Sequence, residues 1–180
     1  MLTLGHGTAT ADELAELIRG AEIKTVVDVR AFPKSRLHPQ FWSEAMAQWI
    51  PEKGGSAYLW EPALGGFRKP DRNSPNIALR NERFRAYADY METEAFANAL
   101  AALLARTFSE RIAILCSETL WWRCHRRLIA DAATLLNGIA VKHLMHDGTL
   151  HDHIPTAGVR VTDKGTLRYD VLFEAAESDA

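Results

Sequence analysis

The hydrophobic positions of this chain follow two spacings, one typical of buried strands and the other of amphipathic helices. Short, mostly apolar runs lie at residues 1–5, 25–29, 57–60, 112–116 and 139–144. Runs of this length suit strands, and the β-branched run at residues 25–29 suits a strand that is buried on both faces of a parallel sheet. Between several of these runs, apolar residues recur every three or four positions, which places them on one face of a helix. The pattern therefore predicts strands that alternate with helices.

Helix boundaries can be read from capping residues. Thr10 followed by Glu13 forms a capping-box signature, so we expect a helix over residues 11–19 that is closed by Gly20. We also expect a helix from Pro39 to about residue 50, because proline suits a first helical position. Two successive helices are predicted within residues 81–107, with Thr93 capping the second. A further helix is predicted from Arg123 or Cys124 to residue 137.

The order strand, helix, strand predicts right-handed βαβ units and an α/β fold. We expect residues 1–155 to form a single Rossmann-like domain, a three-layer sandwich with a mostly parallel central sheet. Residues 156–180 are predicted to form a C-terminal surface hairpin around the turn Asp163-Lys164-Gly165, followed by a frayed tail from Glu174.

The amino-acid composition excludes some classes of protein. Hydrophobic residues make up 47% of the chain and charged residues 24%, which is typical of a globular protein. Lys plus Arg number 21 against 23 Asp plus Glu, so an overtly basic nucleic-acid coat protein is excluded while a local basic pocket is not. The apolar runs are far shorter than the ~20 residues that span a bilayer. With no secretory signal pattern and two cysteines, we expect a cytoplasmic protein without a membrane partner.

Reactive side chains follow three of the predicted strands. His6, Arg30 and Cys116 each lie at or just beyond a strand end. Ligands of open parallel sheets bind outside the carboxyl ends of the strands. We therefore expect guanidinium groups and sulfur atoms from distant parts of the chain to share one cleft.

The segment "LCSETLWWRCHRR" carries the candidate catalytic residues, which are Cys116, Glu118, Cys124 and His125. A helix N-terminus and nearby cations favour a thiolate over a thiol, so Cys124 is a candidate for a lowered pKa. Cys116 can also be interpreted as a small buried hydrophobic residue. The same four residues offer metal-ligand types, but their spacing matches none of the common zinc patterns. We therefore assign no metal ligand.

A second group of residues is suited to anions. The candidate anion-binding residues are Arg30, Ser35, Arg36, Gly65, Gly66, Arg68 and Arg126. Arginine presents a rigid charged fork to phosphate or carboxylate, and paired glycines permit close backbone approach. Asp28 is expected to form a salt bridge that fixes the loop. Trp60, Trp121 and Trp122 flank these segments and suit either a nucleobase or the edge of the core.

The same segments resemble the domain of unknown function 488 family of small bacterial and archaeal proteins. The motifs "LGHGT", "VVDVRAFPKSR", "LGGFR", "YADYM" and "LCSETLWWRCHRRLIAD" occur in the same order, and the resemblance covers residues 2–153. The family's motif residues correspond here to Arg30, Pro33, Ser35, Arg36, Gly65, Gly66, Arg68, Cys116, Glu118, Cys124, His125 and Arg126. The resemblance implies no activity, because the family's name assigns none.

Together these observations favour an enzyme that acts on an anionic substrate, either phosphate-bearing, a nucleotide or derived from nucleic acid. One alternative is a non-catalytic module that binds nucleic acid or a phosphorylated ligand. The other is a metal-binding protein that uses Cys116, Glu118, Cys124 and His125. The sequence assigns no cofactor and no oligomeric state.

Overall fold

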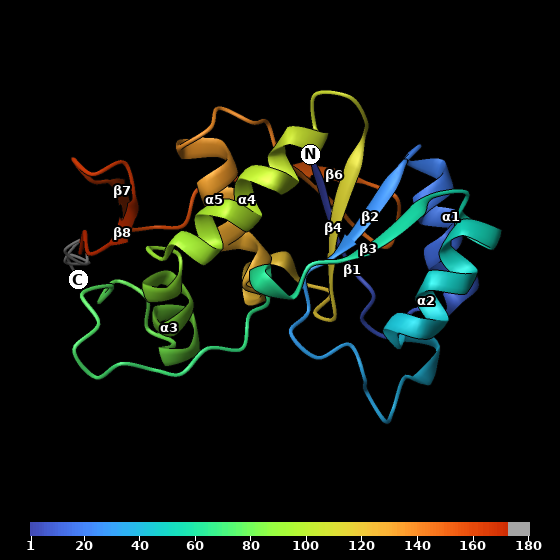
Figure 1. Ribbon diagram of the computed structural model, residues 1–180, viewed down its shortest axis with the longest axis horizontal. Coiled ribbons are helices and arrows are strands. Elements are labelled where there is room, and N and C mark those ends of the chain that lie inside the picture. The colour runs from blue at the N-terminus through green and yellow to red at the C-terminus, as the bar shows by residue number, and fades with distance from the viewer. Residues whose placement is uncertain (173–180) are drawn as a thin grey trace, which may run out of the picture.

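The computed structural model describes residues 1–172, in which a six-stranded sheet runs through the middle of the molecule (Figure 1). The strands are β1 (Leu2–Gly5), β2 (Thr25–Asp28), β3 (Ala57–Trp60), β4 (Ile112–Cys116), β5 (Lys142–Leu144) and β6 (Leu150–Asp152). Their order is β3-β2-β4-β1-β5-β6, with β1 to β5 parallel and β6 antiparallel to β5. The predicted α/β fold with a mostly parallel central sheet is confirmed.

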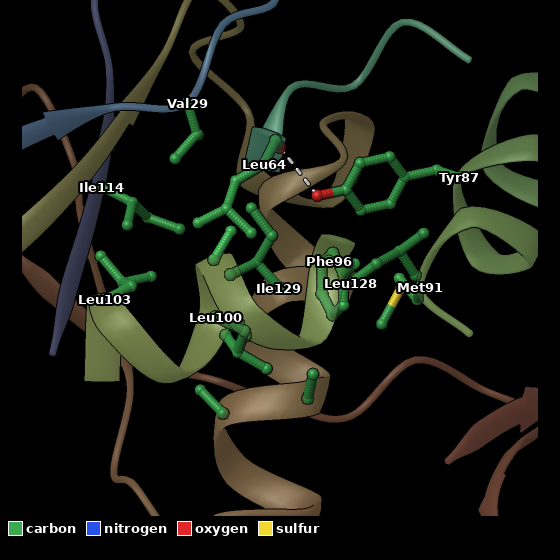
Figure 2. Packing of buried hydrophobic residues seen from close by; sticks show 14 of the residues in the cluster. Val29, Leu64, Tyr87, Met91, Phe96, Leu100, Leu103, Ile114, Leu128 and Ile129 are labelled. Atoms are coloured by element: carbon green, nitrogen blue, oxygen red, sulfur yellow. Dashed lines mark hydrogen bonds between the residues drawn. The ribbon is translucent and has the colours of Figure 1, made fainter. Parts of the chain in front are cut away.

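Helices cover both faces of the sheet (Figure 1). Helices α1 (Ala11–Gly20) and α2 (Ser43–Trp49) lie on one side, and α3 (Glu82–Tyr90), α4 (Glu94–Arg106) and α5 (Arg126–Leu135) lie on the other. Each side has its own hydrophobic core. On the α4 and α5 side, Leu103 and Ile129 pack against Ile114 of the sheet, and the Tyr87 hydroxyl donates a hydrogen bond to the Leu64 carbonyl (Figure 2).

The predicted N-terminal caps of two helices are present, but Gly20 is not a left-handed cap of α1. It is the last residue of the helix, and Glu22 takes the positive φ of 53°. The Glu13 backbone N–H donates to Thr10 Oγ1 at 3.2 Å, and Glu13 Oε2 accepts from the Thr10 backbone N–H at 2.7 Å. Thr93 Oγ1 accepts from the Phe96 N–H at the start of α4. These reciprocal bonds satisfy backbone donors that would otherwise lack partners, so local sequence is sufficient to set these boundaries.

Two predicted helices begin later than expected. The segment from Pro39 is a 3₁₀ turn, Pro39–Phe41, followed by an extended residue and then α2. Phe41 is completely buried and stacks on His6 with ring centroids 4.2 Å apart, and this long-range contact interrupts the helix. After β4, the chain forms a 3₁₀ turn at Trp121–Arg123 and an extended Cys124 before α5 begins at Arg126. Cys124 thus lies outside the first helical turn.

The C-terminal hairpin consists of β7 (Val159–Val161) and β8 (Leu167–Tyr169), with Gly165 at a positive φ of 73° in the turn. It was expected on the surface, but Tyr169 is 0% exposed and packs in the core beside α5. The Tyr169 hydroxyl donates to Asp131 of α5 at 2.9 Å. The predicted frayed tail, residues 174–180, lies outside the described residues. None of the helices in residues 1–172 combines the length and apolar character that crossing a bilayer requires.

Candidate active site

The carboxyl ends of β2, β4 and β1, which are neighbours in the sheet, open onto one pocket of about 450 Å³. The His6 N–H donates to the Cys116 carbonyl at 3.0 Å, and the Val29 N–H donates to the Leu115 carbonyl at 2.9 Å. These bonds continue the parallel pairing beyond the ends of β1 and β2. The loops after β1, β2 and β4 therefore begin at the same edge of the sheet. The titratable or cationic residues that line the pocket are His6, Arg30, Lys34, His38, Cys116 and His125.

A thiol–imidazole cluster forms the buried wall of this pocket. His125 Nε2 lies 3.1 Å from the Val29 carbonyl oxygen, which can only accept, so Nε2 carries the proton. In the neutral ring, Nδ1 is then an acceptor. It faces Cys116 Sγ at 3.8 Å and Cys124 Sγ at 3.7 Å. One imidazole nitrogen is thus placed to accept a proton from either thiol.

The two thiols differ in acidity. A hydrogen bond from the Cys124 thiol, together with His125 and Arg126, holds the pKa of Cys116 well below its ordinary value, although burial opposes the shift. Burial raises the pKa of Cys124, and the neighbouring Cys116 adds to this effect. Of the two, Cys116 lines the pocket. The sequence led us to expect the lowered pKa at Cys124. Burial and the neighbouring Cys116 outweigh the Arg126 charge and its backbone N–H at the start of α5, which do act to lower the pKa of Cys124.

The paired glycines bring a second loop onto the cluster. A Cβ atom at Gly66 would lie 2.4 Å from His125 Nδ1, and one at Gly65 would lie 2.8 Å from Ala31. Both contacts are closer than a real side chain permits. Gly66 therefore allows the backbone to rest on the imidazole ring, while Tyr87 contacts His125 edge-on with ring centroids 5.0 Å apart. The ring is held between these two neighbours.

Arg30 is bound mainly within the protein. Its Nε and Nη2 donate to the two oxygens of Asp28 at 2.8 and 2.5 Å, and Nη2 also donates to the Phe41 carbonyl. Nη1 lies 3.3 Å from His6 Nε2. Because guanidinium has five N–H donors, these contacts leave one N–H of Nη1 for a ligand. Burial and the adjacent Arg30 charge lower the pKa of His6 to about 4, so this ring is neutral at pH 7.

Arg126 lies beneath the loop after β4. It is 1% exposed and donates to the carbonyls of Glu118 and Thr119 at 2.5 and 2.8 Å. Within residues 1–172 it forms no salt bridge with a carboxylate. A buried charge without a counterion is costly. Its field lowers the pKa of Cys116, so the charge stabilises negative charge at that sulfur.

The structure brings some of the predicted residues together and leaves others apart. Arg30, Ser35, Gly66, Cys116 and His125 line the pocket, Cys124 lies within 4.8 Å of the other two members of the cluster, and Gly65 and Arg126 support the surrounding loops. Arg36, Arg68 and Glu118 do not line the pocket. The Arg68 guanidinium lies 3.7 Å above the Tyr90 ring, while Arg36 and Glu118 are exposed.

Sequence reasoning missed His38, Phe32 and Phe67, which also line the pocket. Phe32 and Phe67 are apolar residues within loops that are otherwise basic or rich in glycine and proline. Large apolar residues in loops of this composition were the sequence feature that could have identified Phe32 and Phe67 as pocket residues.

The cluster also contains possible metal ligands. The donor atoms of Cys116, Cys124 and His125 all lie within 4.8 Å of one another, and two sulfurs with one imidazole match an open zinc site. Glu118, the fourth ligand considered from the sequence, is exposed and is not part of this group. The neighbouring Arg30 and Arg126 oppose a further cation at this position.

Fold and site together define an α/β protein with two thiols and an imidazole at the carboxyl edge of a parallel sheet. Residues 10–133, well over half of the chain, match the family described as domain of unknown function DUF488, and the chain belongs to this family. The resemblance found in the sequence motifs is thereby confirmed. No curated protein and no solved structure matches the chain.

Proposed function

We propose that this protein is an enzyme in which Cys116 acts as a nucleophile on an anionic substrate bound in the pocket. The observation that carries the proposal is the position of His125. Its Nε2 is fixed by the Val29 carbonyl, and its Nδ1 faces the sulfur of Cys116. A nucleophile beside a base that is itself oriented by a third group is the arrangement that covalent catalysis requires.

The charge of the pocket favours an anionic substrate. Arg30 and Lys34 line it together with His6, His38 and His125, and no carboxylate is among the described residues of its wall. Asp28 offsets much of the Arg30 charge, and Lys34 forms an exposed ion pair with Glu44 at 3.0 Å, which contributes little in water. Arg126 adds a buried cation nearby that has no carboxylate partner among the described residues. Preorganised cations in a site with little water interact strongly with charge that develops during reaction.

The reaction that follows from this geometry has two steps. His125 Nδ1 takes the proton of the Cys116 thiol, and the resulting thiolate attacks an electrophilic centre of the substrate. A bond from sulfur to that centre forms, the bond to the leaving group breaks, and the leaving group takes the proton from His125. Water then hydrolyses the covalent intermediate with His125 as the base, which restores the thiol.

The test is alkylation by iodoacetamide as a function of pH, followed by mass spectrometry of each cysteine. We expect Cys116 to react with an inflection well below the pH of an ordinary thiol, and Cys124 to react far more slowly. His125→Asn should move the Cys116 inflection towards the ordinary value, whereas the exposed control His151→Asn should not. If both cysteines titrate as ordinary thiols, the nucleophile proposal fails.

A metal-dependent function is the second candidate, favoured by the close approach of two sulfurs and one imidazole nitrogen. Metal analysis of protein purified without a histidine tag distinguishes a metal-dependent function from the proposed Cys116 nucleophile. We expect less than about one tenth of an equivalent of zinc or iron, because the surrounding cations oppose a metal ion. Stoichiometric metal that is lost in Cys124→Ser would replace the nucleophile proposal by a metal site.

A further inference from the structure

Two phenylalanines stand at the mouth of the pocket. Phe32 is 77% exposed and Phe67 is 73% exposed, although both line the pocket. Their rings meet edge to face with centroids 5.9 Å apart. Large apolar side chains that are exposed together beside a cavity mark a binding surface more often than singly scattered ones do.

The backbone on each side of this aromatic pair is firmly held. The Tyr87 hydroxyl donates to the Leu64 carbonyl at 2.8 Å, and Gly66 rests on His125, which fixes the loop that carries Phe67. In the other loop, Trp60 Nε1 donates to the Arg30 carbonyl at 2.9 Å. Rings presented on anchored backbone lose little conformational freedom when a ligand packs against them.

We propose that the pocket binds a phosphorylated nucleoside unit, with its base on Phe32 and Phe67 and its phosphate beside Arg30 and Lys34. The inference rests on the proposed function in placing the substrate in this pocket, and it names the class of that substrate. A flat heterocycle matches the exposed aromatic faces, and a phosphate matches the cationic wall. The volume, about 450 Å³, is within the range of small-molecule sites, so one nucleotide unit fits better than a folded macromolecule.

The closing experiment measures binding by calorimetry to the wild-type protein at 50 mM salt. The probes are adenosine 5′-monophosphate, ribose 5-phosphate, which lacks the base, and adenosine, which lacks the phosphate. We expect the complete nucleotide to bind about tenfold or more tightly than either part, because stacking and charge both contribute. Ribose 5-phosphate that binds as tightly as the nucleotide would overturn the proposal, as would the absence of binding by all three.

Substitutions of the two phenylalanines test where the base of the nucleotide binds. Phe32→Ala and Phe67→Ala should each weaken nucleotide binding by about tenfold and leave ribose 5-phosphate binding unchanged. The matched control is Phe108→Ala, since Phe108 is 84% exposed and precedes β4 at the end of that strand opposite the pocket. If the two pocket variants bind the nucleotide as the control does, the proposal fails. If Phe67→Ala instead abolishes a concentration-dependent dimer, the pair is a self-association surface and the proposal also fails.

The base and phosphate that the pocket is proposed to bind can belong to a free nucleotide or to one nucleotide of a single-stranded nucleic acid. Equal affinity for the mononucleotide and a five-nucleotide single strand supports the free nucleotide. Tighter strand binding with a steeper salt dependence supports the strand. These results are separable from the nucleophile proposal, because Cys116→Ser should abolish any covalent step and retain nucleotide binding. Ordinary thiol titration with intact nucleotide binding would remove the nucleophile and leave the ligand site.

Discussion

Two groups of buried polar side chains differ in how completely their hydrogen bonds are satisfied. Around Asp131, a chain of bonds runs from Thr3 Oγ1 to His143 at 2.7 Å, from His143 to His153 at 3.0 Å, and from His153 to Asp131 at 3.0 Å. Asp131 also accepts from the Tyr169 hydroxyl. In this group, here called the Asp131 network, every imidazole nitrogen has a close partner.

The cluster of Cys116, Cys124 and His125 is bonded much more loosely. One nitrogen of His125 is fixed by a backbone carbonyl, and the other has only two sulfur atoms near 3.8 Å. Its remaining side faces the pocket. Fully satisfied buried networks stabilise and specify a fold, whereas a group left with spare bonding capacity beside a cavity can act on a ligand. The bonding of the Asp131 network is therefore suited to stability, whereas the thiol cluster keeps the spare bonding capacity on which the proposed nucleophile depends.

The largest expected effect is on stability in the Asp131 network. Asp131→Ala should lower the free energy of unfolding by about 3 kcal/mol, because it removes the acceptor from buried partners including His153 and Tyr169. Urea denaturation followed by circular dichroism measures it. The control Asp152→Ala removes an exposed carboxylate and its surface ion pair with Lys142, and should leave the free energy of unfolding nearly unchanged. Equal costs for both variants would contradict the comparison.

The second prediction concerns pH. Burial and the neighbouring His153 and Arg126 lower the pKa of His143 to about 3, so the ring is neutral in the fold, whereas in the unfolded chain it binds a proton near pH 6.5. The unfolded state therefore gains stability as the pH falls below 6.5. We expect this histidine to reduce the free energy of unfolding by about 2 kcal/mol between pH 7.5 and pH 5.

Urea titrations at a series of pH values measure this effect. His143→Gln should flatten the dependence by that amount, even though its stability at pH 7.5 is lower. His151→Gln removes an exposed imidazole that lies opposite His143 on β6 and is the weakest cause of its lowered pKa, so it should change the slope far less than His143→Gln does. An unchanged slope in His143→Gln would show that His143 does not titrate as expected.

A smaller effect is expected on reactivity in the thiol cluster. Gly66→Ala introduces a Cβ 2.4 Å from His125 Nδ1, so the imidazole must shift from its position between Gly66 and Tyr87. The rate of Cys116 alkylation at pH 7 should fall about tenfold, because a misplaced base loses much of its effect. Gly20→Ala is the matched control, since its Cβ meets nothing within 4 Å. A normal rate in Gly66→Ala would mean that His125 does not govern the thiol.

The smallest effect is expected from one hydroxyl of the Asp131 network. Tyr169→Phe removes the bond to Asp131 and should cost about 1 kcal/mol in the free energy of unfolding. In an Asp131→Ala background the same change should cost much less, because the acceptor is already gone. Additive costs in this double-mutant cycle would show that the two side chains are not coupled.

The sequence was sufficient wherever short-range patterns determine structure. The five parallel strands and the Thr10–Glu13 capping box were predicted because each depends on neighbouring residues, whereas the antiparallel strand β6 was not predicted. The same patterns could not reveal that Phe41 stacks on His6, or that Cys124 is extended, since both depend on segments far apart in the chain. The salt bridge expected of Asp28 is present and binds Arg30, whereas the sequence could not show that Arg36 and Arg68 lie outside the pocket.

The burial of Tyr169 determines where the chain can be truncated without opening its core. The family match ends at residue 133, and the boundary expected from the sequence lay after residue 155, yet an aromatic ring from beyond both points fills the interior beside α5. A fragment ended at either position would leave that space to water and Asp131 without the Tyr169 hydroxyl. The last hairpin thus completes the same interior as the sheet, and shortened versions of the protein should retain it through residue 172.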